Sequence, residues 1–192
     1  MSAPALDGFS IRRATVQDAA ALGDIQSQGW RAAYKGLVPQ PVLDELTPPR
    51  QAARLASYLQ EEDAEFHLAT LQDVPIGFVA VEACRDKDLP PTTGEVGALY
   101  LLPRLWGKGY GRRLLRFGVA RLARIGLSPV VLWVLKDNLA TRRFYHACGF
   151  APDGAEKPAD YGAELVLVRY IYPAHHAPRP AAKEEPPWDT TY

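Results

Sequence analysis

The stretch that decides the fold is GEVGALYLLPRLWGKGYGRRLL, which covers residues 94–115. Its first part, Val96 to Leu102, is an apolar run between a glycine and a proline and is typical of a buried strand. A turn with three glycines within residues 107–111 follows, and a helical spacing of apolar residues begins at Arg112. The stretch therefore predicts a strand, a glycine-rich turn and a helix in direct succession.

This succession has the physical properties of an anion-binding site. Glycines let the backbone approach a ligand closely, and the first N–H groups of a helix point outward at the positive end of its dipole. Lys108, Arg112 and Arg113 add positive charge beside the turn. We therefore expect a phosphate-bearing cofactor on residues 107–112, with these candidate residues: Gly107, Lys108, Gly109, Tyr110, Gly111 and Arg112.

The glycine spacing excludes two common nucleotide sites. No Gly-Lys-Ser/Thr follows a first glycine at the spacing of a P-loop. A dinucleotide fold needs GxGxxG early in a βαβ unit and an acid about 20 residues later. Here the pattern is GxGxG in the middle of the chain, and no acid follows the helix until Asp137. A simple tight connection is the alternative for a glycine-rich turn taken alone.

A second informative stretch, VLWVLKDNLATRRFYHACGF, covers Val131 to Phe150. Residues 130–135 are apolar at every position, which suits a strand that is covered on both faces. Because the helix over about 112–125 makes a crossover, we expect this strand to run parallel to the one at 96–102. A short helix over 139–147 follows, and Gly149 ends it.

Together the two stretches resemble the GCN5-related N-acetyltransferase (GNAT) family. The segment WGKGYGRRLL is similar to the loop that holds the acyl-CoA pyrophosphate in that family, usually written Q/R-x-x-G-x-G/A. Trp106 stands where Gln or Arg is usual, but the contacts of this loop are mostly made by backbone N–H groups, so we expect the loop to function. The resemblance extends from about Ile11 to Tyr172.

The resemblance implies an α/β fold. We expect a mixed central sheet of about six or seven strands, with splayed parallel central strands and about four flanking helices. Residues 1–172 then form one domain, and residues 173–192 form a proline-rich tail without apolar periodicity. The strands that the residue pattern predicts lie at 9–14, 66–71, 76–83, 96–102, 130–135 and 164–171.

The resemblance also implies acetyl-CoA as co-substrate. In GNAT proteins the pantetheine arm lies between the two splayed strands, which places it alongside Leu99, Tyr100 and Leu101 here. A backbone N–H near Leu101 would polarise the thioester carbonyl. Asn138 matches a position that contacts the cofactor or orders the turn. Gly97, in the middle of the strand, suits a bulge that opens the splay, and a simple packing glycine is the alternative.

Two residues match positions with catalytic roles in the family. Tyr145 matches the residue that donates a proton to the leaving thiolate, and a core-edge aromatic is the alternative. Glu95 opens the central strand, where many GNAT proteins place a glutamate that acts as base directly or through water. Partial burial at a strand end would raise its pKa to suit that role. The alternative for Glu95 is a solvated charge.

Trp30 and Tyr34 are four residues apart and so share one face of the first helix. In GNAT proteins the first helices form one wall of the acceptor pocket, so both are candidate substrate-binding residues. The alternative is that both are core aromatics.

Composition bounds the function further. The 22 basic and 22 acidic side chains balance, which argues against a nucleic-acid or anionic-membrane partner. Cys84 and Cys148 have no metal spacing, and we expect no metal. No secretory leader pattern and no apolar run of about 18 residues is recognised, so we expect a cytoplasmic protein. A last strand followed by an ordered tail would suit a homodimer.

The sequence thus favours direct transfer of an acetyl group from acetyl-CoA to a primary amine of a small molecule. Acetylation of a protein N-terminus or lysine is one alternative. Trp133 counts against the N-terminal subclass, because some of its members carry a carboxylate at that place. A non-catalytic acyl-CoA sensor is the other alternative, and Tyr145 and Glu95 count against it because a pure binding module needs neither.

Overall fold

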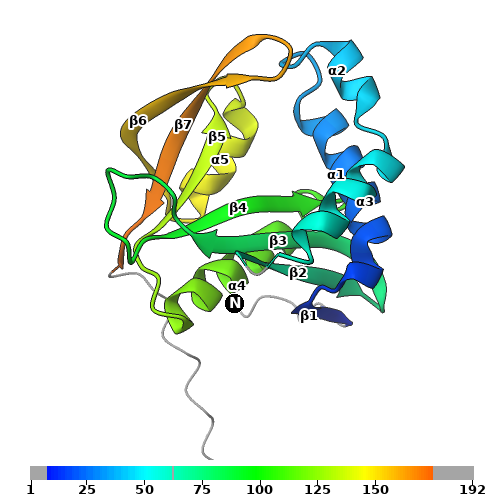
Figure 1. Ribbon diagram of the computed structural model, residues 1–192, viewed down its shortest axis with the longest axis horizontal. Coiled ribbons are helices and arrows are strands. Elements are labelled where there is room, and N and C mark those ends of the chain that lie inside the picture. Colours follow the sequence, from blue (N-terminus) through cyan, green and yellow to red (C-terminus); the bar gives the residue numbers. More distant parts are fainter. Residues whose placement is uncertain (1–7, 62, 175–192) are drawn as a thin grey trace, which may run out of the picture.

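The computed structural model describes residues 8–61 and 63–174 (Figure 1). The tail expected at 173–192 falls outside the described residues from 175 onward. The described elements follow one another in this order: β1 (Phe9–Arg13), a 3₁₀ turn (Val16–Asp18), α1 (Ala19–Ala33), α2 (Gln40–Glu45), α3 (Pro48–Tyr58), β2 (Ala64–Leu71), β3 (Val74–Ala83), β4 (Gly94–Leu101), a second 3₁₀ turn (Pro103–Leu105), α4 (Tyr110–Arg124), β5 (Val130–Leu135), α5 (Leu139–Ala147), β6 (Ala151–Asp160) and β7 (Glu164–Tyr172).

The seven strands form one mixed sheet in the order β1-β2-β3-β4-β5-β7-β6. Every neighbouring pair is antiparallel except β4 and β5, which are parallel and joined through α4. This confirms the predicted fold class and the predicted parallel central pair.

The two parallel strands stay together over a very short distance. Gly94 pairs with Val130 and Glu95 with Val131, and no further pair follows. Beyond that point β5 and β7 turn away from β3 and β4, as Figure 1 shows. The bulge expected at Gly97 is present, because Ala80 pairs with Ala98 while Val81 pairs with Val96, which leaves Gly97 as the extra residue.

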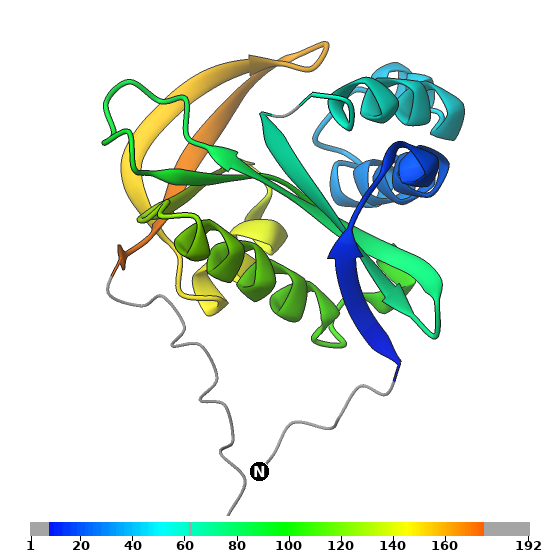
Figure 2. The same cartoon turned by 60° about the horizontal axis from the view of Figure 1, so that its bottom comes forward.

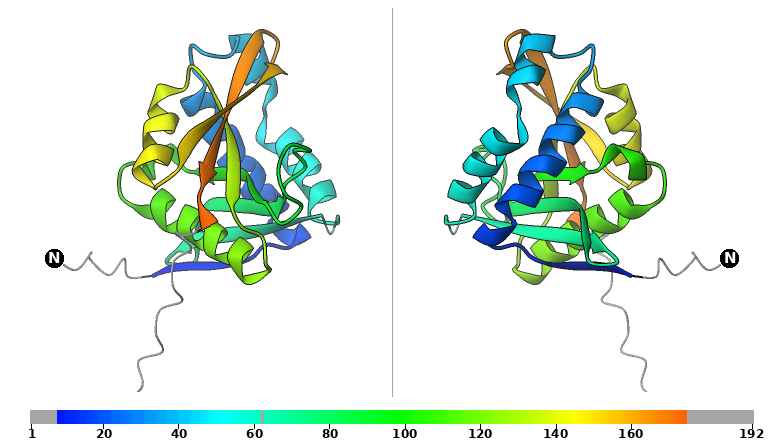
Figure 3. Two further views of the ribbon diagram at one scale, coloured as in Figure 1. Left: turned by 90° about the vertical axis from the view of Figure 1, so that its left-hand side faces the viewer. Right: turned by 90° about the vertical axis from the view of Figure 1, so that its right-hand side faces the viewer.

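Helices cover both faces of the sheet. Helices α1 and α3 pack against each other on one face, and α4 and α5 lie on the other (Figures 2 and 3). We call these the α1 face and the α4 face. On the α4 face, Gly118 lets helix α4 approach β3 closely, since a Cβ there would lie 3.0 Å from Val79. The leucines of α4 at 114, 115 and 122 are fully buried in the same core.

Several boundaries and elements differ from the sequence prediction. The described residues form five α-helices rather than about four, because residues 40–45 form the short helix α2, in which only Leu43 is buried. Strand β6 was not predicted, since this edge strand is polar and largely exposed and shows no apolar alternation. Helix α4 begins at Tyr110 rather than Arg112. The β2–β3 turn lies at Gln72 and Asp73, between the two strands predicted at 66–71 and 76–83, and both residues have positive φ.

Candidate active site

The glycine-rich turn lies between the end of β4 and the first residue of α4. Gly107 and Gly109 have φ of 75° and 88°, a left-handed conformation that strongly favours glycine. A Cβ at either position would have no neighbour within 4 Å, so the outer side of the turn is open. Trp106 is exposed and ties the turn to the end of β4, because its indole Nε1 donates a hydrogen bond of 2.9 Å to the Leu101 carbonyl oxygen. The unusual tryptophan is therefore compatible with the loop.

The side chains around this turn divide into two groups. Lys108, Arg112 and Arg113 are exposed, and Arg113 also lies over the ring of Phe9 at 4.4 Å. Tyr110 is buried and stacks on the same ring, with the centroids 5.6 Å apart. Tyr110 thus fixes the start of α4 from the core, and its backbone rather than its ring is available to a ligand.

These features fit the pyrophosphate of a CoA thioester. The first N–H groups of α4 have no partner within the helix, the open turn lies directly before them, and basic side chains surround it. A Cβ at Gly111 would lie 3.6 Å from the ring of Phe144 on α5, so this ring would form a side wall of the pyrophosphate site. The predicted set 107–112 is therefore brought together in one place.

The residues predicted beside the pantetheine arm lie on β4 after its last pair with β5. Leu99 pairs with Val79, and its side chain points to the α4 face. The Leu101 side chain points to the same face, since a Cβ at Gly111 of α4 would lie 3.9 Å from it. The ring of Tyr100 points to the α1 face, where its hydroxyl accepts a hydrogen bond from Trp30. The backbone of all three therefore lies at the splay, whereas their side chains separate to opposite faces.

Asn138 is 4% exposed and caps α5, since its side-chain oxygen accepts a hydrogen bond of 3.1 Å from the Thr141 N–H. Its Nδ2 donates to the Ala33 carbonyl oxygen at the end of α1 at 3.5 Å. Asn138 was expected either to contact the cofactor or to order the turn, and these two hydrogen bonds order the turn.

Tyr145 points from α5 into the interior behind the splay. Its ring packs beside Phe150 and Tyr170, with centroids 6.1 and 6.5 Å away. Burial, followed by the nearby phenol of Tyr100, raises the pKa of the Tyr145 hydroxyl above its usual range. Within the described part of the chain, no side-chain hydrogen bond uses this hydroxyl. It is therefore a buried hydroxyl that keeps its proton at neutral pH.

Four phenols converge around the splay from different elements. The pKa of Tyr34 is raised well above its usual range by burial and by the neighbouring phenols Tyr100, Tyr145 and Tyr161.

The wall predicted from Trp30 and Tyr34 is an aromatic cluster. Their ring centroids lie 4.5 Å apart, which confirms that they share one face of the first helix. Tyr161, in the β6–β7 turn, adds a third ring 5.2 Å from Trp30. Sequence reasoning missed Tyr161, because its neighbours in sequence show no motif and only the tertiary fold brings it here.

Two carboxylates face the same side of the sheet. Glu95 pairs in register with Glu82 on β3. Burial, then Glu82, then Asp86 raise the pKa of Glu95, in the direction expected for partial burial. Burial also raises the pKa of Glu82. The sequence pattern indicated Glu95 alone, because the pairing of β3 with β4 is not visible in it.

The comparisons with known proteins agree with this geometry. The sequence profile of the acetyltransferase (GNAT) family matches residues 30–150. The chain belongs to the GNAT family. Mycothiol acetyltransferase of Kocuria rhizophila is 32% identical over 112 residues, which are 53% of this chain and 37% of that protein. The uncharacterized N-acetyltransferase YuaI of Bacillus subtilis is 26% identical over 169 residues, which are 83% of this chain and 87% of that protein.

The first relatives by sequence are mycothiol acetyltransferases, and the matches cover only 20% to 37% of their length. Among solved GNAT structures, the PaiA N-acetyltransferase of Thermoplasma acidophilum in complex with coenzyme A superposes with a TM-score of 0.67 and 20% identity, over 83% of this chain and 97% of that one. YncA of Salmonella typhimurium, with its cofactor acetyl-CoA, superposes with a TM-score of 0.65 and 24% identity, over 91% and 98%. These structures show the fold.

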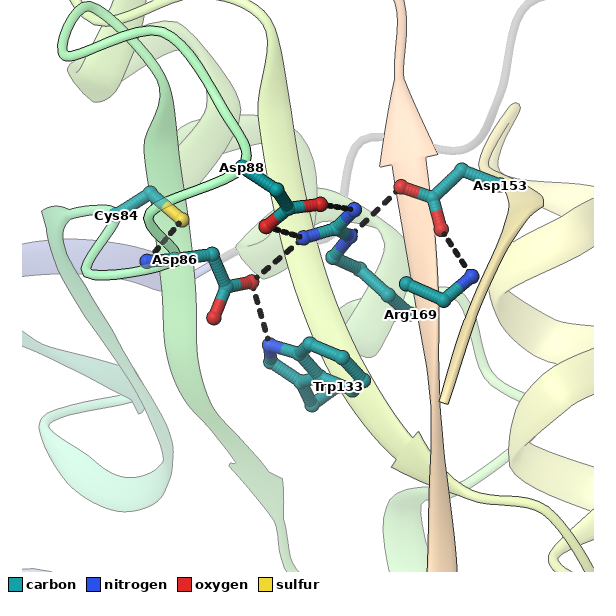
Figure 4. Close-up of polar contacts among 7 residues, drawn as sticks. Cys84, Asp86, Asp88, Trp133, Asp153 and Arg169 are labelled. Carbon is teal, nitrogen blue, oxygen red and sulfur yellow. Dashed lines mark hydrogen bonds and ion pairs between the residues drawn. The ribbon is translucent and has the colours of Figure 1, made fainter. Parts of the chain in front are cut away.

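An arginine beside this GNAT site ties three elements together (Figure 4). The guanidinium of Arg169 on β7 donates to Asp153, Asp86 and Asp88 at 2.7, 3.0 and 2.6 Å. Asp86 also accepts a hydrogen bond of 3.1 Å from the Trp133 indole. The cluster holds the β3–β4 loop against β7 on the α1 face, and no sequence motif indicated it.

Arg112, which belongs to the predicted cofactor site, also borders a cavity. A cavity of about 260 Å³ between α4 and α5 is lined by residues that include Arg112, Arg116 and Cys148. In residues 8–61 and 63–174, no group of three or more His, Cys, Asp or Glu side chains could hold a metal ion. None of the helices described for this chain is long and apolar enough to cross a membrane.

Proposed function

We propose that this protein is an acetyl-CoA-dependent N-acetyltransferase that transfers the acetyl group directly to a primary amine of a small molecule. The observation that carries the proposal is the splay of β4 and β5 after Glu95. Tyr145, which we assign as the proton donor, is buried on α5, and two carboxylates lie directly opposite each other on β3 and β4. Membership of the GNAT family gives the reaction class in which such an arrangement has a use.

The bound thioester supplies the acyl group, and the residues of this chain supply binding and proton transfer. We assign the pyrophosphate to the open turn at Gly107 and Gly109 with Lys108 and Arg112, and the pantetheine arm to the backbone of Leu99–Leu101. A backbone N–H near Leu101 would polarise the carbonyl. The related structures of PaiA and YncA, which contain coenzyme A and acetyl-CoA, support the choice of acetyl-CoA as the co-substrate.

Two proton transfers accompany the exchange of the C–S bond for a C–N bond. The acceptor amine must lose a proton before its lone pair can attack, and we assign this step to the carboxylate pair, in which the sequence motif indicated Glu95. The sulfur leaves with the electrons of the C–S bond, and the Tyr145 hydroxyl supplies its proton. The sequence shows no Ser/His/Asp or Cys/His set for a covalent route, so we assign a single direct transfer.

The shape of the α1 side supports a small acceptor. Trp30, Tyr34 and Tyr161 pack against one another, and the β6–β7 turn touches α2, since a Cβ at Gly162 would lie 2.5 Å from the Val42 side chain. A peptide would need an open groove between these elements. Acetylation of a protein N-terminus or lysine is therefore the second candidate, and a non-catalytic sensor is the third.

A thiol-release assay tests the proposal. Acetyl-CoA is incubated with the full chain and a panel of amino acids, polyamines, aminoglycosides and peptides, and acetylated products are identified by mass spectrometry. Amine-dependent thiol release with a small acceptor is the expected result. Turnover of peptides alone would favour the second candidate. Saturable acetyl-CoA binding without turnover of any amine would favour the sensor.

A further inference from the structure

Glu82 and Glu95 are directly opposite each other on neighbouring strands. Side chains in such a position have Cβ atoms about 4.5–5.5 Å apart, and like charges there destabilise the sheet. Neither glutamate is fully exposed, so solvent screens their repulsion only in part. A pair of this kind does not contribute to folding, and a role in chemistry would account for it.

The bulge of β4 places the Glu82 carboxylate near the splay. A Cβ at Gly97 would lie 2.5 Å from Oε1 of Glu82, so the carboxylate rests against the bulge residue. The pairing of β4 with β5 ends at Glu95, two residues earlier. Glu82 thus reaches across β4 to the place where the two central strands separate. Glycine at 97 leaves the space that the carboxylate fills.

The surroundings of Glu82 favour a protonatable carboxylate. Its side chain is 14% exposed, and burial is the largest cause that raises its pKa. Asp63 raises the pKa further, whereas Arg85, which lies 3.2 Å away and is largely exposed, lowers it. The net direction is upward.

Glu95 lies among more charges. Burial, Glu82 and Asp86 raise its pKa, and Lys157 and Arg85 lower it, again with an upward net direction. When both carboxylates are ionised, each disfavours the charge of the other, and a proton is bound more tightly by the pair than by an isolated glutamate.

We propose that Glu82, whose carboxylate rests against Gly97 at the splay, is the general base of the transfer and that Glu95, directly opposite it on β4, is a positioning residue. This inference rests on the proposed function. A proton moves from the acceptor ammonium to the Glu82 carboxylate, and the amine nitrogen forms its bond to the acetyl carbon. The C–S bond breaks, and the thiolate takes the proton of the Tyr145 hydroxyl. The nitrogen, which still carries one proton too many for an amide, loses it to solvent, Tyr145 regains a proton from solvent, and Glu82 releases its own proton to solvent.

The test compares pH profiles of kcat/KM for the wild type and four variants, with the amine that the wild type turns over fastest. Glu82→Gln removes the base. Gly97→Ala keeps it but pushes it away, because the new methyl group occupies the position of the carboxylate. Glu95→Gln removes the neighbouring charge. Glu156→Gln is the control, since Glu156 forms an exposed pair with Lys136.

We expect Glu82→Gln to lower kcat by about 10²-fold or more and to abolish the acid limb of the profile. Gly97→Ala should lower kcat at least about tenfold, because its methyl group displaces the Glu82 carboxylate. Glu95→Gln should shift the acid limb to lower pH and reduce kcat less than Glu82→Gln does. Glu156→Gln should match the wild type. Acetyl-CoA affinity within about twofold of the wild type shows that each variant is folded.

Two results would overturn the assignment. One is that Glu82→Gln and Gly97→Ala keep the wild-type profile while Glu95→Gln loses its acid limb, which would make Glu95 the base. The other is that the acid limb is unchanged in every variant. If the wild type itself turns over no amine, the proposed function fails, and the role of Glu82 fails with it. That outcome is distinct from the two results above, in which the wild type is active. If Glu82→Gln does not fold, Gly97→Ala decides the question.

Discussion

The indole Nε1 of Trp30 donates a hydrogen bond of 2.6 Å to the hydroxyl of Tyr100. Trp30 lies in the last turns of α1, and Tyr100 lies on β4 after the strand has parted from β5. The bond therefore fixes the aromatic wall of the α1 face to the strand that we expect to hold the thioester.

The variant Trp30→Phe keeps an aromatic ring but loses this donor. We expect it to lower the free energy of unfolding by about 1–2 kcal/mol, because the buried Tyr100 hydroxyl loses its partner. It should also raise KM for the acceptor several-fold and leave the Kd for acetyl-CoA within about twofold. Urea unfolding, steady-state kinetics and calorimetric titration measure the three quantities. An acceptor KM equal to that of the wild type would remove Trp30 from the wall.

Tyr145→Phe deletes the hydroxyl that we assign to the leaving thiolate. The expected result is a fall in kcat of about 10²-fold with unchanged acetyl-CoA affinity, because the proton is needed only during the chemical step. Tyr58→Phe is the matched control, since Tyr58 is an exposed tyrosine at the end of α3. Equal kcat values in Tyr145→Phe and Tyr58→Phe would show that solvent protonates the thiolate.

The raised pKa of Glu95 predicts a pH-dependent stability. In the unfolded chain the pKa of a glutamate is about 4.3, and the pKa of Glu95 in the native state lies above that value. Between the two pKa values the native state binds more protons, so the stability falls as the pH rises through this window. Glu95→Gln should therefore raise Tm relative to the wild type at pH 8 but not at pH 4. A Tm difference that does not depend on pH would contradict the raised pKa.

Arg169→Met tests the carboxylate cluster of Figure 4. The Arg169 side chain is 5% exposed, and its removal leaves Asp86 and Asp153 without the charge that neutralises them. We expect a loss of about 3–5 kcal/mol in the free energy of unfolding. Lys136→Met, which breaks an exposed pair with Glu156, should cost less than about 0.5 kcal/mol. Equal losses in both variants would show that the cluster contributes no more than a surface pair.

Local patterns in the sequence predicted the parts of the site that are built locally. The strand, glycine turn and helix of residues 94–115 are specified by neighbours in sequence, and so are the bulge glycine and the apolar strand β5. Trp30 and Tyr34 could be placed on one face because helical spacing alone decides this.

The missed parts depend on contacts between distant segments. Glu82 became visible only through the pairing of β3 with β4, and Tyr161 only through the turn that brings β6 and β7 to α1. Strand β6 contributes little to the core, so it carries no apolar signal. Helix α2 is short, and Leu43 is the sole buried side chain within it.

The most direct test of the account is a calorimetric titration of acetyl-CoA into the wild type, Gly109→Glu and Gly126→Glu. Both glycines have positive φ, 88° and 82°, and neither has a neighbour near its Cβ, so the two variants carry the same backbone strain and the same added charge. They differ in place, because Gly109 precedes α4 and Gly126 follows it. We predict saturable, micromolar binding by the wild type and by Gly126→Glu, with affinity reduced at least about tenfold in Gly109→Glu. Absence of binding by the wild type, or equal affinity in all three proteins, would contradict the assignment of the cofactor to this turn.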